Sequence, residues 1–132
     1  MSVREKWDSV DIPTFVAAWL EERRHGGSDV DDSLDMRATL MSFTASPEVQ
    51  WQFICSAVEQ SKQDDELSAI AAGPFESLMG KHGCTYIDQL EQLCQTNAKF
   101  ARMTTGAWQH TMTEEVWTRV QAIQSSASLL GD

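Results

Sequence analysis

Apolar residues recur with the period of an α-helix through most of this chain. In the clearest stretch they lie three or four positions apart, at Ile12, Phe15, Val16, Trp19 and Leu20. This spacing places the side chains on one face of a helix. Alternating apolar and polar runs, which indicate β-strands, do not occur, and neither do the Asn-Gly or Asp-Gly pairs typical of hairpin turns. The sequence therefore predicts an all-α fold.

Capping residues and helix breakers set the boundaries of the predicted helices. Asp11, Ser46, Asn97 and Thr113 each precede a helical stretch and carry an oxygen that can accept from its free N–H groups. The helices are predicted at residues 12–25, 34–45, 47–61, 65–79, 86–95, a short segment after Asn97, and 114–124.

The second and third of these helices are joined by a very short connection. Their proximity predicts an antiparallel helical hairpin. The apolar stripe of the second helix consists of Leu34, Ala38 and Met41, with Leu40 and Phe43 alongside.

The fourth predicted helix contains Gly73-Pro74, and its apolar spacing continues in phase across this pair. The segment is either one kinked helix or two short helices with Pro74 at the first position of the second. The preserved phase favours the kink. Gly80 to Gly83 should end this helix, and Thr85 with Asp88 resembles a capping box for the next one.

A length of 132 residues fits one domain, and we expect a single compact unit of five to seven short helices. Its core should cover residues 12–124, with a frayed tail at 125–132. The short connections suit either a stack of helical hairpins or a plain bundle.

Cysteine content and the first residues of the chain indicate the cytoplasm. Cys55, Cys84 and Cys94 are an odd number, which does not suit a disulfide framework. Residues 4, 5, 6 and 8 are charged where a signal peptide needs an apolar core. No run of about 18 apolar residues occurs, so we expect no membrane span.

Acidic residues outnumber basic residues by 20 to 10, which gives a formal net charge of -10. This excess argues against a nucleic-acid binder, which needs a basic face for phosphate contacts. Two clusters stand out, and they either keep the protein soluble or form a docking surface for a basic protein. They consist of Asp29, Asp31, Asp32 and Asp35, and of Asp64, Asp65 and Glu66.

The residues that could carry chemistry do not form a recognisable site. His25, His82 and His110 have no His or Cys partner at a metal-binding spacing. Cys84 lies near His82 and just before a predicted helix, but nothing marks a third, orienting residue, so we interpret it as a buried or half-buried thiol. Motifs for nucleotide binding and for hydrolases are missing. We expect no catalytic residue, cofactor or metal.

The string SAIAAGPFESLMGKHG at residues 68–83, followed by Tyr86-Ile87-Asp88, resembles the signature of an uncharacterised bacterial domain family of unknown function. The resemblance extends over about residues 12–123, but the family is richer in arginine between Phe100 and Trp108, where this chain has only Arg102. It implies an all-α domain and transfers no functional residue. In its small size and acidity the chain also resembles the immunity proteins that bacteria encode beside toxins.

The leading hypothesis is a non-catalytic protein-binding module, namely an immunity protein for a basic toxin such as a nuclease. The two acidic clusters would bind the toxin with an aromatic anchor beside them. Trp7, Trp51 and Trp108 lie outside the main apolar stripes, and they either anchor an interface or, as we favour, pack over the edges of the core. One alternative is a small enzyme or ligand-binding domain with a pocket near Gly73–His82, including Glu76. Another is a helical adaptor subunit that binds a peptide in a groove.

Overall fold

The computed structural model describes residues 7, 9–25 and 34–130, and every regular element within them is helical. The all-α prediction is therefore confirmed. The elements are α2 (Ile12–Arg24), α3 (Leu34–Thr44), α4 (Pro47–Gln60), α5 (Asp64–Ile70), the π-helical turn η1 (Ala71–Phe75), α6 (Glu76–Thr96), α7 (Ala98–Thr104) and α8 (Glu114–Leu130).

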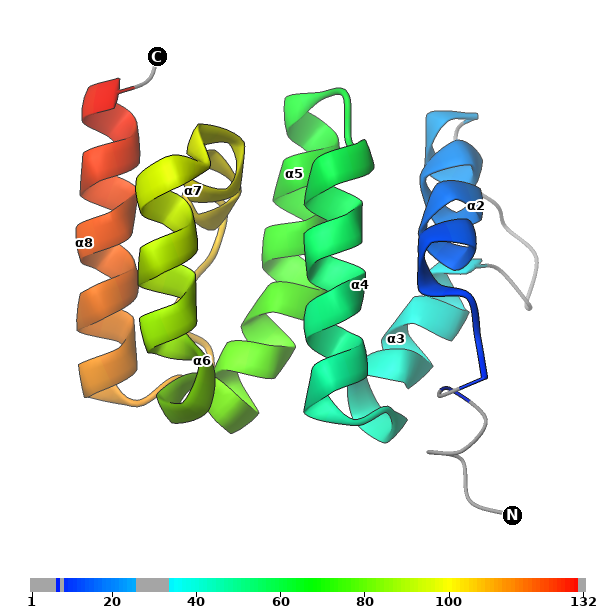
Figure 1. Cartoon of the computed structure of the whole chain (residues 1–132), viewed down its shortest axis with the longest axis horizontal. Coiled ribbons are helices and arrows are strands. Elements are labelled where there is room, and N and C mark those ends of the chain that lie inside the picture. Colours follow the sequence, from blue (N-terminus) through cyan, green and yellow to red (C-terminus); the bar gives the residue numbers. More distant parts are fainter. Residues whose placement is uncertain (1–6, 8, 26–33, 131–132) are drawn as a thin grey trace.

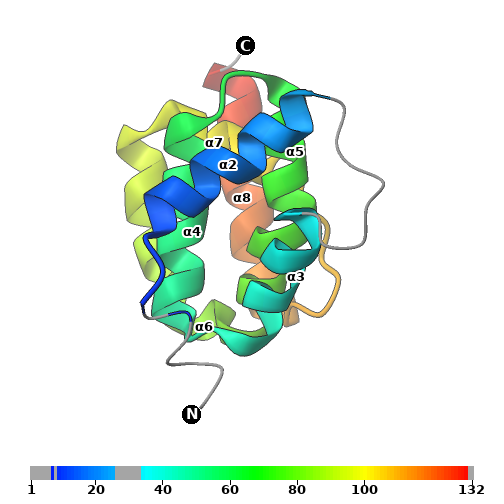
Figure 2. The ribbon, with the colours of Figure 1, turned by 90° about the vertical axis from the view of Figure 1, so that its right-hand side faces the viewer.

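The helices stand beside one another in a row, with α2 at one end and α8 at the other (Figure 1). Contacts join α2 to α3 and α4, and at the other end they join α8 to α6 and α7. In the view down the row, α4 lies on one side, α3 and α5 lie on the other, and α2 crosses the end (Figure 2). The described helices form one compact domain. The predicted antiparallel hairpin of α3 and α4 is wrong, because α3 packs against α2, η1 and α6 instead of along α4.

The predicted N-caps are confirmed. The side chains of Asp11, Ser46 and Asn97 accept hydrogen bonds from the N–H groups of residues 14, 49 and 100, at 3.3, 3.3 and 3.0 Å. Thr113 does the same for the N–H of residue 116, at 3.2 Å. Each cap satisfies a backbone donor that the helix itself cannot, and so fixes where the helix begins.

Aromatic rings link the helices through the core. Phe53 of α4 is fully buried and lies 5.5 Å from Phe15 and 5.3 Å from Trp19 between ring centroids. Trp51, on another face of α4, lies 5.2 Å from Tyr86. Trp7 and Trp51 are buried, which confirms the favoured interpretation that they pack over the core and leaves neither as an exposed anchor.

The helix that contains Pro74 is distorted but continuous, as the phase of its apolar residues predicted. In η1 the N–H of Glu76 donates to the carbonyl of Ala71, five residues back, and the residues flanking the turn keep helical dihedrals. Proline lacks an N–H and clashes with the carbonyl four residues before it. The wider turn accommodates both defects without ending the helix.

The expected end of this helix at Gly80–Gly83 is confirmed. The span labelled α6 consists of two helices that meet at His82, whose φ of −132° and ψ of 23° leave the helical region. The chain reverses direction within α6 (Figure 1). A Cβ on Gly80 would collide with the Thr111 hydroxyl, so this glycine serves close packing rather than helix termination.

The last helix is longer than predicted. Residues 125–130, expected to be a frayed tail, continue α8 as far as Leu130. Ala127 is buried against the core at this end. The apolar stripe of α8 thus extends one turn beyond Ile123, which holds the end of the chain in the stack.

Candidate functional site

The first acidic cluster lies largely outside the described residues. This applies to Asp29, Asp31 and Asp32, while Asp35 lies in the first turn of α3. Residues 26–33 lie outside the described structure. Of the described residues near their two ends, one contacts α5 and the other contacts α2. Arg24 bonds Glu66, and the N–H of Leu34 donates to Glu22 Oε1 at 3.0 Å. The end of α2, after which residues 26–33 follow, therefore lies beside Glu66 of the second cluster.

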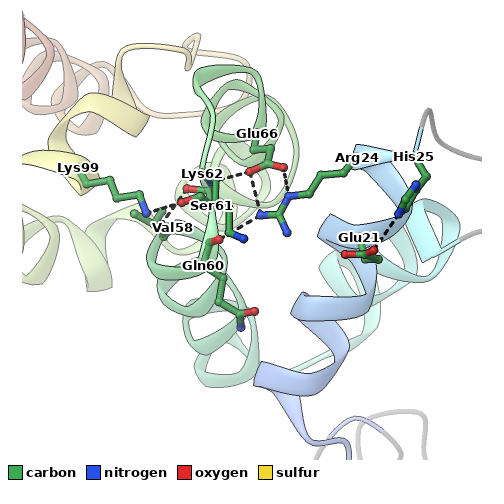
Figure 3. Close-up of polar contacts among 9 residues, drawn as sticks. All are labelled: Glu21, Arg24, His25, Val58, Gln60, Ser61, Lys62, Glu66 and Lys99. Carbon is green, nitrogen blue, oxygen red and sulfur yellow. Dashed lines mark hydrogen bonds and ion pairs between the residues drawn. The ribbon is translucent and has the colours of Figure 1, made fainter.

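Glu66 of the second cluster is buried, with 3% of its surface exposed. Arg24 Nε and Nη2 donate to its two oxygens at 2.7 and 3.2 Å, and the N–H of Lys62 donates to Oε1 at 2.7 Å (Figure 3). Burial by itself raises the pKa of Glu66, but the hydrogen bonds from Arg24 and Lys62 outweigh it and hold the pKa below the usual range. The prediction of a partner-binding role for Glu66 is wrong, because its carboxylate is used inside the fold.

Cations complete this connection at residues 60–66, which we call the α4–α5 corner. Arg24 Nη2 donates to the Gln60 carbonyl at 3.2 Å, and Lys99 Nζ donates to the Ser61 carbonyl at 2.6 Å (Figure 3). Carbonyls at a helix C-terminus lack intrahelical partners and carry partial negative charge. The α4–α5 corner is therefore a polar connection that ties α2 and α7 to the middle of the stack.

The other two residues of the second cluster are at the surface. Asp64 pairs with Arg102 at 3.1 Å, and 73% of its side chain is exposed. Asp65 is exposed and makes no ion pair with the part of the chain that the structure describes. Asp64 and Asp65 stay available to a partner, so the predicted docking surface keeps two of its three residues at this corner.

The outer side of α3 carries three of the exposed large apolar side chains of the described residues. Met36, Leu40 and Phe43 are spaced four and three residues apart and are 52%, 50% and 67% exposed. Ala38 and Met41 on the inner side are buried as predicted. We call the first three residues the α3 face. The sequence already indicates such a face, because α3 has apolar residues on both sides. The spacing, however, predicts Leu40 and Phe43 beside the buried stripe.

Trp108 is the most exposed large apolar side chain among the described residues, at 76%. It lies in the loop of residues 105–112, whose position is fixed from two sides. Glu76 Oε2 accepts the Trp108 N–H at 2.8 Å, and Gln124 Nε2 donates to the Thr104 and Ala107 carbonyls at 2.8 and 3.1 Å. Of the three tryptophans proposed as anchors, only this one is presented to solvent.

His110, in the same loop, has a φ of 49°. This left-handed conformation is costly for a residue other than glycine and persists only where the surroundings enforce it. The loop is therefore held in place rather than relaxed, and Trp108 is held with it.

A cavity of about 300 Å³ separates α3 from the π-helical turn and from this loop. Of the residues around which the sequence predicted a pocket, Gly73, Pro74 and Glu76 line this cavity and His82 does not. Its walls are formed by Trp19, Arg23, Ala38, Thr39, Ser42, Phe43, Ala69, Ala72, Gly73, Pro74, Glu76, Ser77 and His110. In Figure 2, α3 and the orange loop before α8 lie on the same side of the molecule.

The cysteines are free thiols in three different environments. Burial is the main cause that raises the pKa of Cys55 to about 11 and that of Cys94 to about 12, so both stay protonated near neutral pH. Cys84 is exposed, which corrects the expectation of a buried or half-buried thiol. Within the described residues, no three His, Cys, Asp or Glu side chains form a group that could hold a metal ion.

No helix in the described part of the chain is long and apolar enough to cross a membrane.

Comparison with known proteins identifies a family but no characterised relative. No curated protein and no solved structure matches the chain. A family model described as a family of unknown function (DUF6869) matches residues 27–128, which confirms the resemblance to an uncharacterised domain family. The chain belongs to this family, DUF6869.

Proposed function

We propose that this chain is a non-catalytic protein-binding module, namely an immunity protein that neutralises a basic toxin such as a nuclease. One observation carries the proposal. Met36, Leu40 and Phe43 expose half or more of their surface on one side of α3. Exposed apolar surface of this kind costs solvation energy in the free protein and marks sites that a partner covers.

The charge of the chain supports a basic partner. The formal net charge is -10, and Asp29, Asp31 and Asp32 immediately precede α3 in the sequence. Complementary potentials raise association rates and select partners, while apolar contacts resist dissociation. An acidic segment followed directly by an apolar helix face supplies both contributions. Asp64 and Asp65 add two exposed acidic side chains at the α4–α5 corner.

The direct test is binding to the product of the neighbouring gene. We expect the purified proteins to form a complex whose association slows as salt is added, and co-expression to rescue cells from that product. A chain with Met36, Leu40 and Phe43 all replaced by serine should lose the complex. Replacing the exposed Thr118 of α8 by serine is the control and should leave binding unchanged. Failure of both binding and rescue by the unmodified chain would refute the proposal.

The cavity favours a second candidate, a small-ligand-binding domain. Its volume of about 300 Å³ lies at the lower end of the range for small-molecule sites. A compound that raises the thermal stability of the isolated chain, and that loses this effect when Gly73 is enlarged, would support this candidate over protein binding. The adaptor hypothesis also uses the α3 face and differs only in the partner. The identity of the protein in the complex would therefore distinguish an adaptor from an immunity protein.

A further inference from the structure

We infer that the cavity beside the π-helical turn receives an arginine side chain of the bound protein. This inference rests on the proposed protein-binding function and names the contact at its centre. The argument uses the size of the cavity, the charge of Glu76 and the aromatic residues at its edge.

The size of the cavity suits one long side chain. Its volume of about 300 Å³ is too small for a large cofactor, and it opens beside the α3 face, because Phe43 belongs to both. A Cβ placed on Gly73 would have no atom within 4 Å, so glycine at this wall leaves space that core packing does not use. The space is thus available to a group from outside the chain.

Glu76 supplies an acceptor at this site. It is half-buried, and its Oε2 accepts the Trp108 N–H at 2.8 Å. In the described part of the chain, no basic side chain forms an ion pair with it. A partly desolvated carboxylate with one hydrogen bond is stabilised by a cation that brings further donors. The planar guanidinium of arginine donates in pairs to such a carboxylate.

Aromatic residues of the cavity lining suit a guanidinium group. Phe43 lies on the α3 side, with Lys81 Nζ 4.6 Å from its ring centroid, and Trp19 lies on the α2 side. Guanidinium groups stack on aromatic faces. The same cavity wall already contains one example, since Arg23 lies over the Trp19 ring at 5.5 Å from its centroid. Arg23 already occupies the Trp19 side of the lining, so we place the incoming guanidinium at Glu76, the acidic residue of this lining.

Other occupants fit the charges less well. A second copy of this chain would bring together two molecules that each carry a net charge of -10. A neutral apolar side chain would desolvate Glu76 further without supplying a positive charge. A partner with an arginine beside an apolar surface satisfies both the cavity and the α3 face.

The test uses N-acetyl-arginine methylamide as the probe, titrated into the full chain and followed by the indole N–H signal of Trp108. The Trp108→Phe variant assigns that signal. The neutral isostere N-acetyl-citrulline methylamide is the matched control. We expect saturable binding of the arginine compound and binding about tenfold weaker for the citrulline compound, because only arginine forms charge-assisted hydrogen bonds.

Two variants place the probe. Glu76→Gln keeps an acceptor for the Trp108 N–H and should remove the preference for arginine over citrulline. Gly73→Leu fills the cavity from its open wall and should abolish binding, while circular dichroism shows an unchanged fold. Equal binding of arginine and citrulline, or arginine binding that survives in both variants, would overturn the inference.

The outcome is separable from that of the proposed function. If the serine variants of the α3 face prevent complex formation but Glu76→Gln leaves both complex and titration unchanged, the inference fails and the proposed function stands. If no partner binds the chain at all, the proposed function fails, and the inference that depends on it falls with it.

Discussion

The α4–α5 corner and the α3 face are opposite in chemistry and in role. At the corner, the acidic Glu66 is 3% exposed and is bonded by Arg24 and Lys62. On the face, the apolar Phe43 is 67% exposed. An acidic residue thus lies inside the molecule and a large aromatic residue outside it. The comparison shows that a charge with internal partners stabilises the fold. On the α3 face Lys81 Nζ lies 4.6 Å from the Phe43 ring centroid, yet half or more of each of the three apolar residues stays exposed to a partner.

Removing the carboxylate at the corner should have the largest effect. We expect Glu66→Ala to lower the free energy of unfolding by about 3 kcal/mol, because Arg24 and the Lys62 N–H lose a buried acceptor. Urea denaturation followed by circular dichroism measures this change. Asp65→Asn, one residue away and exposed, is the control and should stay within about 0.5 kcal/mol of the parent. Equal effects of the two variants would contradict the distinction between buried and surface acids.

A smaller loss of stability should follow when the loop that contains Trp108 is displaced. Gly80→Ala would push a methyl group against the Thr111 hydroxyl, and we expect it to lower stability by about 1–3 kcal/mol through overpacking. Gly73→Ala is the matched control, since its Cβ has no neighbour within 4 Å. Gly73→Ala should be neutral or stabilising by up to about 1 kcal/mol because alanine favours helix. Thermal denaturation of both variants would show whether the loop is fixed as described.

Acid should weaken the corner reversibly. Hydrogen bonds from Arg24 lower the pKa of Glu66 against the effect of burial, and hydrogen bonds from Arg119 lower that of Glu91. A carboxylate with a lowered folded-state pKa contributes its full stability above the ordinary glutamate pKa of about 4.3 and loses it as the pH falls through the folded value. The melting temperature should therefore fall below about pH 4.3. In Glu66→Ala this dependence should be shallower, and an unchanged slope would count against the assignment.

The smallest stability effect is expected on the α3 face. Phe43→Ser should change the free energy of unfolding by no more than about 0.5 kcal/mol, because most of the ring is already in water. Phe53→Ala, in the core, should cost about 3–5 kcal/mol by comparison. Equilibrium denaturation of both chains tests this contrast. A large loss of unfolding free energy in Phe43→Ser would mean that the α3 face stabilises the monomer and is not a surface left exposed for a partner.

Local sequence signals predicted the helices well and the surface poorly. The caps at Asp11, Ser46, Asn97 and Thr113 act on residues three positions away, so they could be read directly from the sequence. The partner of Glu66 is Arg24, 42 positions earlier in the chain. Nothing in the local pattern distinguishes Glu66 from the exposed Asp64 and Asp65 beside it.

The candidate cavity was predicted in part for a similar reason. Proline at position 74 marked an irregular helix, and irregular turns often lie beside functional sites. The contribution of α3 and of His110 depends on how distant segments pack, which a single sequence does not reveal. His82 was expected to line the cavity, but it is the residue at which α6 changes direction.

The sequence by itself determined that this chain is helical, where most helices begin, and that it carries a large negative charge. These properties follow from spacing, capping and composition, which act over a few residues or over the chain as a whole. Tertiary structure alone decided that Glu66 is buried, that Phe43 and Trp108 are exposed, and that Gly73 opens onto a cavity. Burial depends on which helices pack together, because a helix with apolar residues on two sides can cover only the one that faces a neighbour.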